Sequence, residues 1–192
     1  MRDLLALGSK IHRQEVTVDR ARLTVTFGLD AAEHASRVSR GAPAVTDEAL
    51  LSALMNVPAD RLGPVDARQA KVLRTRCDSG VANIVEDPDG GLWAQRRIGP
   101  PIQVLSIELA ASSLKRGCAA AQRWVGYGPR VVRGGRTPSA FDLTEASHYG
   151  VGYITDDGDR LLAPDPYCSR VWSSARWRFA EVVYGQFREQ LG

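Results

Sequence analysis

The chain has 192 residues, of which 44% are hydrophobic and 24% are charged. These proportions are typical of a globular protein and exclude a disordered or fibrous chain. The apolar runs Val104–Leu109 and Val182–Tyr184 are far shorter than the roughly 20 residues that span a bilayer, and the first residues lack a signal peptide's apolar segment. We therefore expect a cytoplasmic protein that does not enter a membrane.

Cysteine and histidine are too sparse for a structural metal site. Cys77, Cys118 and Cys168 are widely spaced, no Cys-x-x-Cys pair occurs, and the chain has only three histidines. An odd number of isolated cysteines predicts neither a zinc site nor a disulfide framework.

Positive charge is concentrated in one stretch, although the net charge is only +3. Residues 92–139 contain eight Lys and Arg residues and a single acidic residue, Glu108. Such a distribution predicts a surface that binds phosphates, with an ordinary solvated face as the alternative. The residues expected to contact DNA are Arg96, Arg97, Arg116, Arg123, Arg130, Arg133 and Arg136.

Residues 1–76 are expected to form a mainly helical N-terminal region. Its one strand-like alternation is Arg22–Phe27, where apolar and polar residues take turns. Asp30 and Thr46 stand where helix N-caps are expected, and Pro64-Val65-Asp66 introduces a further short helix. The three predicted helices cover residues 30–38, 46–56 and about 66–74.

Residues 77–192 are expected to form an α/β domain with a C-terminal helix. Residues 80–86 and 92–98 flank a strong turn signal and predict a hairpin. Ile102–Leu109 is nearly all apolar, as expected of a strand inside a sheet, and Glu108 lies at its end. The remaining predictions are a helix from Ser112 or Ser113 with Leu114, Cys118, Ala121 and Val125 buried, a strand at 129–132, a helix at 139–149, strands at 150–155 and 160–163, and a helix from Ser173 or Ser174 to about 190.

This order of elements resembles the PD-(D/E)XK superfamily of restriction-type and repair nucleases. Gly80–Gly90 is similar to the family's hairpin, Val104–Ala110 to its E-x-K strand, and Lys115–Tyr127 to its Gln-bearing helix. His148–Ile154, followed by Asp-Asp-Gly and Leu-Leu-Ala-Pro, is similar to its closing segment. The resemblance implies a restriction-endonuclease-like core, a mixed central sheet flanked by helices, and a DNA endonuclease that hydrolyses phosphodiesters with Mg²⁺ or Mn²⁺.

The resemblance also implies a set of site residues, two of which depart from the family pattern. Enzymes of this family hold the metal with a hairpin acid and the Glu of E-x-K, and place the Lys beside the reacting phosphate. Glu108 matches the Glu, Asn83 stands at the position of the acid, and Ala110 at that of the Lys. Lys115 is expected to supply the missing charge, and Gln122 corresponds to the Gln of the helix.

Three explanations of the departures remain open at this stage. The protein cleaves DNA with Lys115 and a neighbouring acid, Asp78 or Asp87; or it has lost catalysis and kept DNA binding; or Asn83 and Ala110 are deliberate inactivating substitutions. For Glu108 itself, a salt bridge to an arginine is the alternative to a metal. Other functional alternatives are a scaffold subunit of a defence or mobile-element complex and a protein-interaction domain, and a homodimer is compatible with each.

Overall fold

The computed structural model describes residues 10–167 and 171–191. Its contacts divide the chain into two compact units, each discontinuous in sequence. We call the unit made from residues 29–103 and 172–192 the helical unit, and the unit made from residues 10–28 and 104–171 the sheet unit. The change of character that the sequence predicts at residues 76 and 77 falls inside the helical unit.

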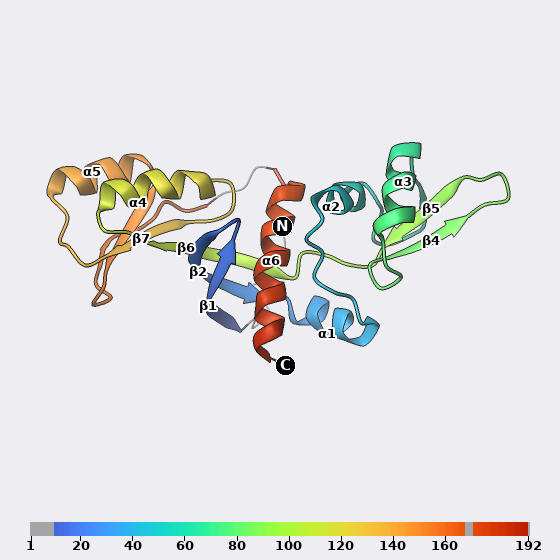
Figure 1. Ribbon diagram of the computed structural model, residues 1–192, viewed down its shortest axis with the longest axis horizontal. Coiled ribbons are helices and arrows are strands. Elements are labelled where there is room, and N and C mark those ends of the chain that lie inside the picture. The colour runs from blue at the N-terminus through green and yellow to red at the C-terminus, as the bar shows by residue number, and fades with distance from the viewer. Residues whose placement is uncertain (1–9, 168–170, 192) are drawn as a thin grey trace. The chain divides into compact units, whose positions relative to one another are not determined.

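The sheet unit is built on a six-stranded mixed sheet (Figure 1). Its strands lie in the order β1-β2-β6-β7-β8-β9, so β6 is an interior strand, as its apolar sequence predicts. The pairs β1/β2 and β8/β9 are antiparallel, whereas β6/β7 and β7/β8 are parallel. The strands are β1 (Ile11–Val18), β2 (Ala21–Leu29), β6 (Ile102–Ala110), β7 (Arg130–Gly134), β8 (Val151–Thr155) and β9 (Arg160–Leu162).

Two helices supply the parallel crossovers and cover one face of this sheet. They are α4 (Leu114–Ala121), which continues as the 3₁₀ turn η2 (Gln122–Trp124), and α5 (Ala140–His148). Ser113, one of the two predicted candidates, caps α4, and Ser139, where the predicted helix begins, caps α5. Val125 is 55% exposed, so its predicted place on the buried face of α4 is wrong. The cause is the 3₁₀ turn, which changes the angular spacing of side chains after residue 121.

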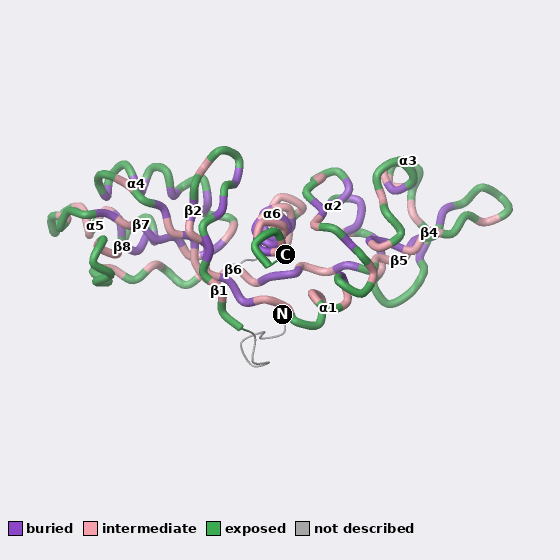
Figure 2. The backbone as a smooth tube through the Cα atoms, turned by 60° about the horizontal axis from the view of Figure 1, so that its bottom comes forward, coloured by how far each residue is buried: buried purple, intermediate pink, exposed green. Residues whose placement is uncertain are grey.

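The N-terminal hairpin is the largest departure from the predicted elements. The sequence predicts one short strand at 22–27, but β2 pairs along its whole length with a further strand, β1. Buried and exposed residues alternate along β1, but the buried positions include the polar Gln14 as well as Val16 and Val18. A polar residue on the buried face weakens the period-2 signal. Figure 2 shows how buried residues follow β2, β7 and β8.

The helical unit consists of helices around a small antiparallel sheet. The predicted hairpin β4/β5 is confirmed, but it belongs to a separate three-stranded sheet of order β3-β5-β4. The N-cap of α2 is Asp47, whose carboxylate accepts from two backbone amides, and not the predicted Thr46. The elements are α1 (Ala31–Arg40), α2 (Glu48–Met55), β3 (Gly63–Pro64), α3 (Ala67–Arg76), β4 (Ala82–Glu86), β5 (Leu92–Arg96) and α6 (Ser174–Leu191).

One apolar core holds the helical unit together. It gathers side chains of α2, α3, β4, β5 and the start of α6, among them the fully buried Leu51, Leu54, Leu73 and Trp177. A buried ion pair lies in the same unit, where Arg37 of α1 donates to both carboxylate oxygens of Glu181 of α6. No helix in the described part of the chain is long and apolar enough to cross a membrane.

Candidate nucleic-acid interface

The face of the six-stranded sheet opposite α4 and α5 carries the residue that the family resemblance singles out. Leu109 pairs with Val132, and a Cβ atom at Gly117 of α4 would meet Val132 at 2.4 Å, so these two side chains point toward the helix. Because side chains alternate along a strand, Glu108 and Ala110 point to the other face. That face contains a hollow of about 460 Å³, lined by Arg13, Thr26, Leu105, Ser106, Glu108, Pro129, Val131, Arg133, Ile154, Arg160, Pro164, Asp165 and Pro166.

Glu108 is held by two arginines in this hollow. Arg13 of β1 donates to both carboxylate oxygens at 3.0 Å, and the Nε of Arg133 of β7 donates to Oε1 at 2.5 Å. The Glu108 side chain is only 11% exposed. Burial by itself would raise the pKa of Glu108, but the hydrogen bonds from Arg133 and Arg13 outweigh it and lower the pKa. The geometry is therefore that of the salt-bridge alternative.

Glu108→Gln is expected to destabilise the protein by about 1–2 kcal/mol at pH 7, less than for a fully buried pair because Arg13 is 55% exposed. A carboxyl whose pKa is lowered by folding stabilises the folded state above its unfolded-state pKa. That contribution is lost as the pH falls from the ordinary value of 4.5 through the lower folded-state pKa. Urea unfolding of parent and variant at pH 7 and at pH 3–4 measures the difference.

The expected result is a difference in unfolding free energy at pH 7 that shrinks in acid. Glu15→Gln on the exposed side of β1 is the matched control, because Glu15 forms no ion pair among the described residues. Equal stability of Glu108→Gln and the parent at pH 7 would contradict a structural role for the Glu108 ion pairs.

The other residues of the predicted catalytic set in this unit do not join Glu108. Ala110 is exposed at the end of β6 and has no polar group. Lys115 is exposed on α4, on the side of the sheet that the helices cover. Hydrogen bonds from Ser139 lower the pKa of Asp142, and the positive charge of Lys115 adds to this effect. Gln122 accepts a hydrogen bond from Arg130 at 3.2 Å. Glu108 thus receives its positive charge from Arg13 and Arg133 and not from Lys115.

Asn83, the predicted partner of Glu108 in metal binding, lies in β4 of the helical unit, opposite Gln95 of β5. The structure therefore places Asn83 and Glu108 in different sheets and different compact units, and does not bring them together within either. The alternative acid Asp87 accepts hydrogen bonds from Asp89, Gly91 and Trp93 and shapes the β4–β5 turn.

The residues around Glu108 do not fit a Mg²⁺ site. Magnesium prefers several free oxygen ligands, usually from carboxylates, but arginines occupy both oxygens of Glu108. Of the described residues of β2, the neighbour of β6 on the side of the N-terminal hairpin, only Thr26 lines the hollow. Within residues 10–167 and 171–191, no three His, Cys, Asp or Glu side chains are grouped so as to hold a metal ion.

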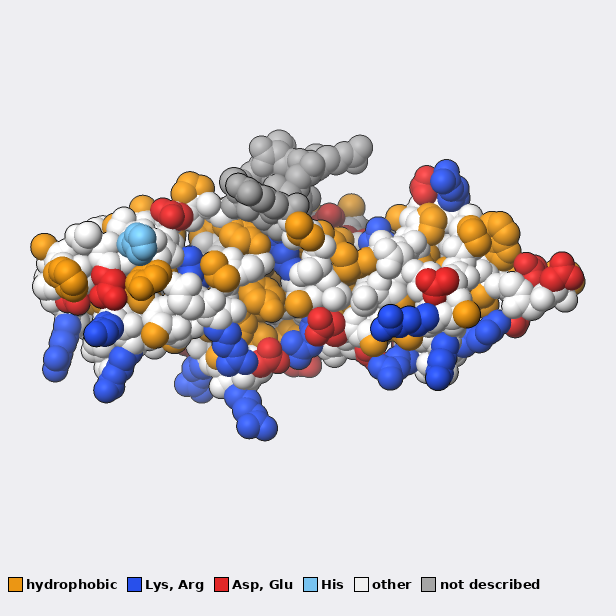
Figure 3. All heavy atoms as spheres, turned by 90° about the horizontal axis from the view of Figure 1, so that it is seen from above, with side chains coloured by type: hydrophobic (Ala, Val, Ile, Leu, Met, Phe, Trp, Pro, Cys, Tyr) orange, Lys and Arg blue, Asp and Glu red, His pale blue; other side chains and the backbone are white. Residues whose placement is uncertain are grey.

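The arginines predicted to contact DNA are divided between the two units. Arg96 and Arg97 belong to the helical unit and the others to the sheet unit. Arg130 is 8% exposed and donates to Gln122 and to the carbonyl of Tyr149, and Arg133 is bound to Glu108. Arg116, Arg123 and Arg136 remain exposed. On the face drawn in Figure 3, Lys and Arg side chains lie on the surface together with Asp and Glu side chains.

Helix α3 of the helical unit carries a concentration of positive charge that the predictions missed. Its ten residues include four cations and no acid. Ala70 and Leu73 are buried in the core, and the cations are exposed on the remaining surface. Two of these cations form ion pairs with carboxylates, Arg74 with Glu86 and Arg76 with Asp47. The other two, Arg68 and Lys71, form no ion pair with any residue that the structure describes.

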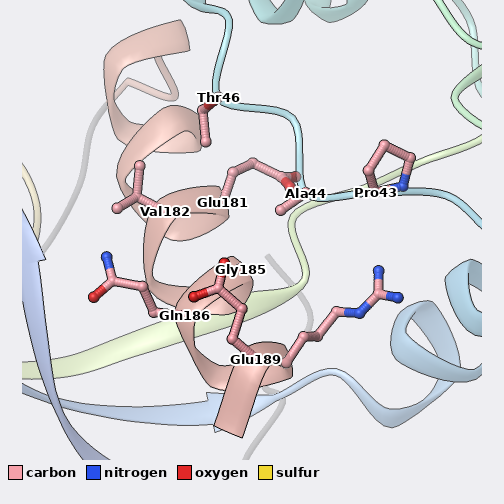
Figure 4. Close-up of a pocket in the computed structure, with 9 residues that line it drawn as sticks. Pro43, Ala44, Thr46, Glu181, Val182, Gly185, Gln186 and Glu189 are labelled. Carbon is pink, nitrogen blue, oxygen red and sulfur yellow. The ribbon is translucent and has the colours of Figure 1, made fainter. Parts of the chain in front are cut away.

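Two hollows of the helical unit are each larger than 500 Å³. One, of about 580 Å³, lies along α6, and Figure 4 shows Glu181 in it, extending from the helix toward the segment of Ala44. Its buried acid, Glu181, is paired with Arg37 and is therefore not free to bind a ligand. The second, of about 570 Å³, is lined by Glu33, Arg40, Ala59, Gln95, Arg96, Arg97, Ile98, Gly99 and Pro100.

Sequence reasoning missed Arg13, Thr26 and Arg160 of the sheet hollow, and Arg68 and Lys71 of α3. The alternation of Ile11–Val18 is the signal that would have revealed β1 and Arg13. The charge of α3 is visible in the sequence, where residues 67–76 contain four cations and no acid. Comparison of the chain with protein-family models, curated proteins and solved structures finds no match in any of the three.

Proposed function

We propose that this protein binds duplex DNA without cleaving it. The helical unit supplies the contact through α3, and the sheet unit is a restriction-endonuclease-like core whose catalytic position is closed by ion pairs. The observation that carries DNA binding is the exposed surface of α3, with Arg68 and Lys71 unpaired among the described residues. Unpaired cations at fixed positions on a rigid helix are suited to phosphates, because they release the counterions of the duplex on contact.

The arrangement around α3 supports insertion into DNA. β3 lies between α2 and α3 in the chain and pairs with β5 of the hairpin, so the segment leading into α3 is held beside that hairpin. An α-helix such as the ten-residue α3 is about 10–12 Å in diameter with its side chains, which matches a major groove about 12 Å wide. The hairpin turn carries Asp87 and Asp89, which would repel phosphates, so α3 rather than the turn makes the contact.

The order of the sheet strands supports the nuclease-like core. A hairpin, β1/β2, lies beside β6, and α4 then leads to the parallel strand β7, which is the order described above for the PD-(D/E)XK family. In this alignment the hairpin position belongs to β2, where Thr26 faces the hollow with Glu108. The family's second acid is absent from β2, whose sequence is ARLTVTFGL. Loss of this acid and the lysine, with Glu108 neutralised, removes the groups that activate water.

The test combines binding and cleavage in one experiment. Purified protein is titrated into a labelled 20–30 base-pair duplex at several salt concentrations, and incubated separately with supercoiled and linear DNA in Mg²⁺ and in Mn²⁺. We expect binding that weakens steeply with salt and no cleavage with either metal. Glu108→Gln is the matched control for the cleavage assay.

Either half of the proposal can fail separately. Cleavage by the parent that Glu108→Gln abolishes would establish a metal-dependent endonuclease and overturn the non-catalytic assignment. Absence of binding to any duplex at low salt would overturn DNA binding and favour a protein-interaction domain.

A further inference from the structure

The hollow of about 570 Å³ in the helical unit is unusually cationic. Three arginines line it, Arg40 at the end of α1, Arg96 at the end of β5 and Arg97 directly after it, together with a single carboxylate, Glu33. None of the three arginines forms an ion pair among the residues that the structure describes, in contrast to Arg37 of the same unit.

Among the residues that the structure describes, these guanidinium groups donate to neutral oxygens. Arg40 donates to the hydroxyl of Ser36 and, at 2.7 Å, to the carbonyl of Arg97. Arg96 donates to the carbonyl of Ile98 at 3.0 Å, and Arg97 to that of Ser79 at 3.4 Å. The Nε atoms of Arg40 and Arg96 are buried without a hydrogen-bond partner. Donor capacity therefore remains unused around the hollow.

Glu33 does not compensate this charge. Its Oε1 accepts from the Nε of Arg37 at 2.7 Å and from the backbone amide of Gly99 at 2.8 Å. Glu181 is likewise bound to Arg37. With Arg37 and both glutamates included, two positive charges remain at the hollow. Burial lowers the pKa of Arg96, although the negative charge of Glu33 acts in the opposite direction.

We propose that this hollow binds a phosphate group, with Arg40, Arg96 and Arg97 as its cationic wall. The uncompensated charge of two matches a phosphate dianion, and arginine's planar fork of donors fits phosphate oxygens. A hollow of about 570 Å³ lies in the range of small-molecule sites and holds a phosphate together with the group that carries it. The site is distinct from α3 and does not depend on the DNA-binding proposal.

The experiment is a calorimetric titration of the full chain with inorganic phosphate and with adenosine 5′-monophosphate, at constant ionic strength. Arg97→Gln and Arg40→Gln are the test variants, because Arg96 also lies over the ring of Trp177 and its loss affects packing. Arg61→Gln is the matched control, an exposed arginine of the same unit outside the hollow. Loss of one charge-assisted hydrogen bond is expected to weaken phosphate binding about tenfold or more in each test variant and to leave the control unchanged.

A competing duplex identifies the source of the phosphate. Displacement of inorganic phosphate by a 20 base-pair duplex would assign the hollow to the DNA backbone, and tighter binding of the nucleotide without such displacement would assign it to a small phosphorylated ligand. Both outcomes support the phosphate site. Equal affinity of the parent, Arg97→Gln and Arg40→Gln, or no binding of either anion, would overturn it, whatever the result for duplex binding at α3.

Discussion

Arg68→Ala combined with Lys71→Ala is expected to weaken duplex binding about 10- to 100-fold near 0.1 M salt. Each phosphate contact contributes about 0.9 to the slope of log affinity against log salt, so the double variant should lower that slope by about 2. The reason is that neither cation has an intramolecular partner among the described residues, and both stand on the first half of a helix anchored by Ala70 and Leu73. Fluorescence anisotropy of a labelled duplex at four or five salt concentrations gives both quantities.

Two controls separate this contact from general positive charge. Arg74→Ala removes a cation of the same helix that is held by Glu86, and is expected to change affinity less than threefold. Lys115→Ala with Arg116→Ala removes two exposed cations from α4 of the sheet unit. Equal losses in all three variants would indicate diffuse electrostatic attraction and contradict a specific role for α3.

Glu181→Leu is expected to destabilise the helical unit by about 3–5 kcal/mol, the cost of leaving a buried charge without its partner. Arg37 and Glu181 are both 0% exposed, and their two hydrogen bonds are 2.6 and 2.8 Å long. Glu181 also accepts from the backbone amide of Val45 and from the indole of Trp177. Removing the carboxylate therefore leaves several buried donors unsatisfied. Guanidinium chloride unfolding followed by tryptophan fluorescence measures the loss.

The double variant Arg37→Met with Glu181→Leu distinguishes an ion pair from simple packing. It is expected to lose less stability than the sum of the two single variants, because the second change removes the charge that the first left unpaired. Glu189→Leu, at an exposed position of the same helix, is the control and should change stability by less than about 0.5 kcal/mol. Strictly additive losses would show that Arg37 and Glu181 stabilise the protein independently.

Local signals in the sequence determined most of the elements. Asp30, Asp66, Ser113 and Ser139 accept backbone hydrogen bonds at helix starts, and the turn after Glu86 closes the hairpin. These features depend on neighbours a few residues away, so they can be predicted without the fold. The interior position of β6 in the sheet order also agrees with its largely apolar composition, which is typical of a strand with neighbours on both sides.

Only the tertiary structure decided which elements share a sheet. The sequence places a hairpin immediately before β6, but β6 instead lies beside β2, whose end precedes it by more than 70 residues. No local sequence signal predicts strand pairing across such a distance, because a strand of either hairpin, β1/β2 or β4/β5, can form the backbone hydrogen bonds that the edge of β6 requires. The predicted pairing of Asn83 with Glu108 in a metal site required β4 and β6 to share a sheet. Because β6 pairs with β2 instead, the two residues belong to different units.

The state of Glu108 was likewise decided by residues far away in sequence. From the sequence, a carboxylate at the end of an apolar strand predicts either a metal ligand or an ion pair, since both relieve the same desolvation. The sequence by itself therefore determined that Glu108 needs a positive partner. The fold determined which one, because it brings Arg13, 95 residues earlier, and Arg133, 25 residues later, to the same face of the sheet.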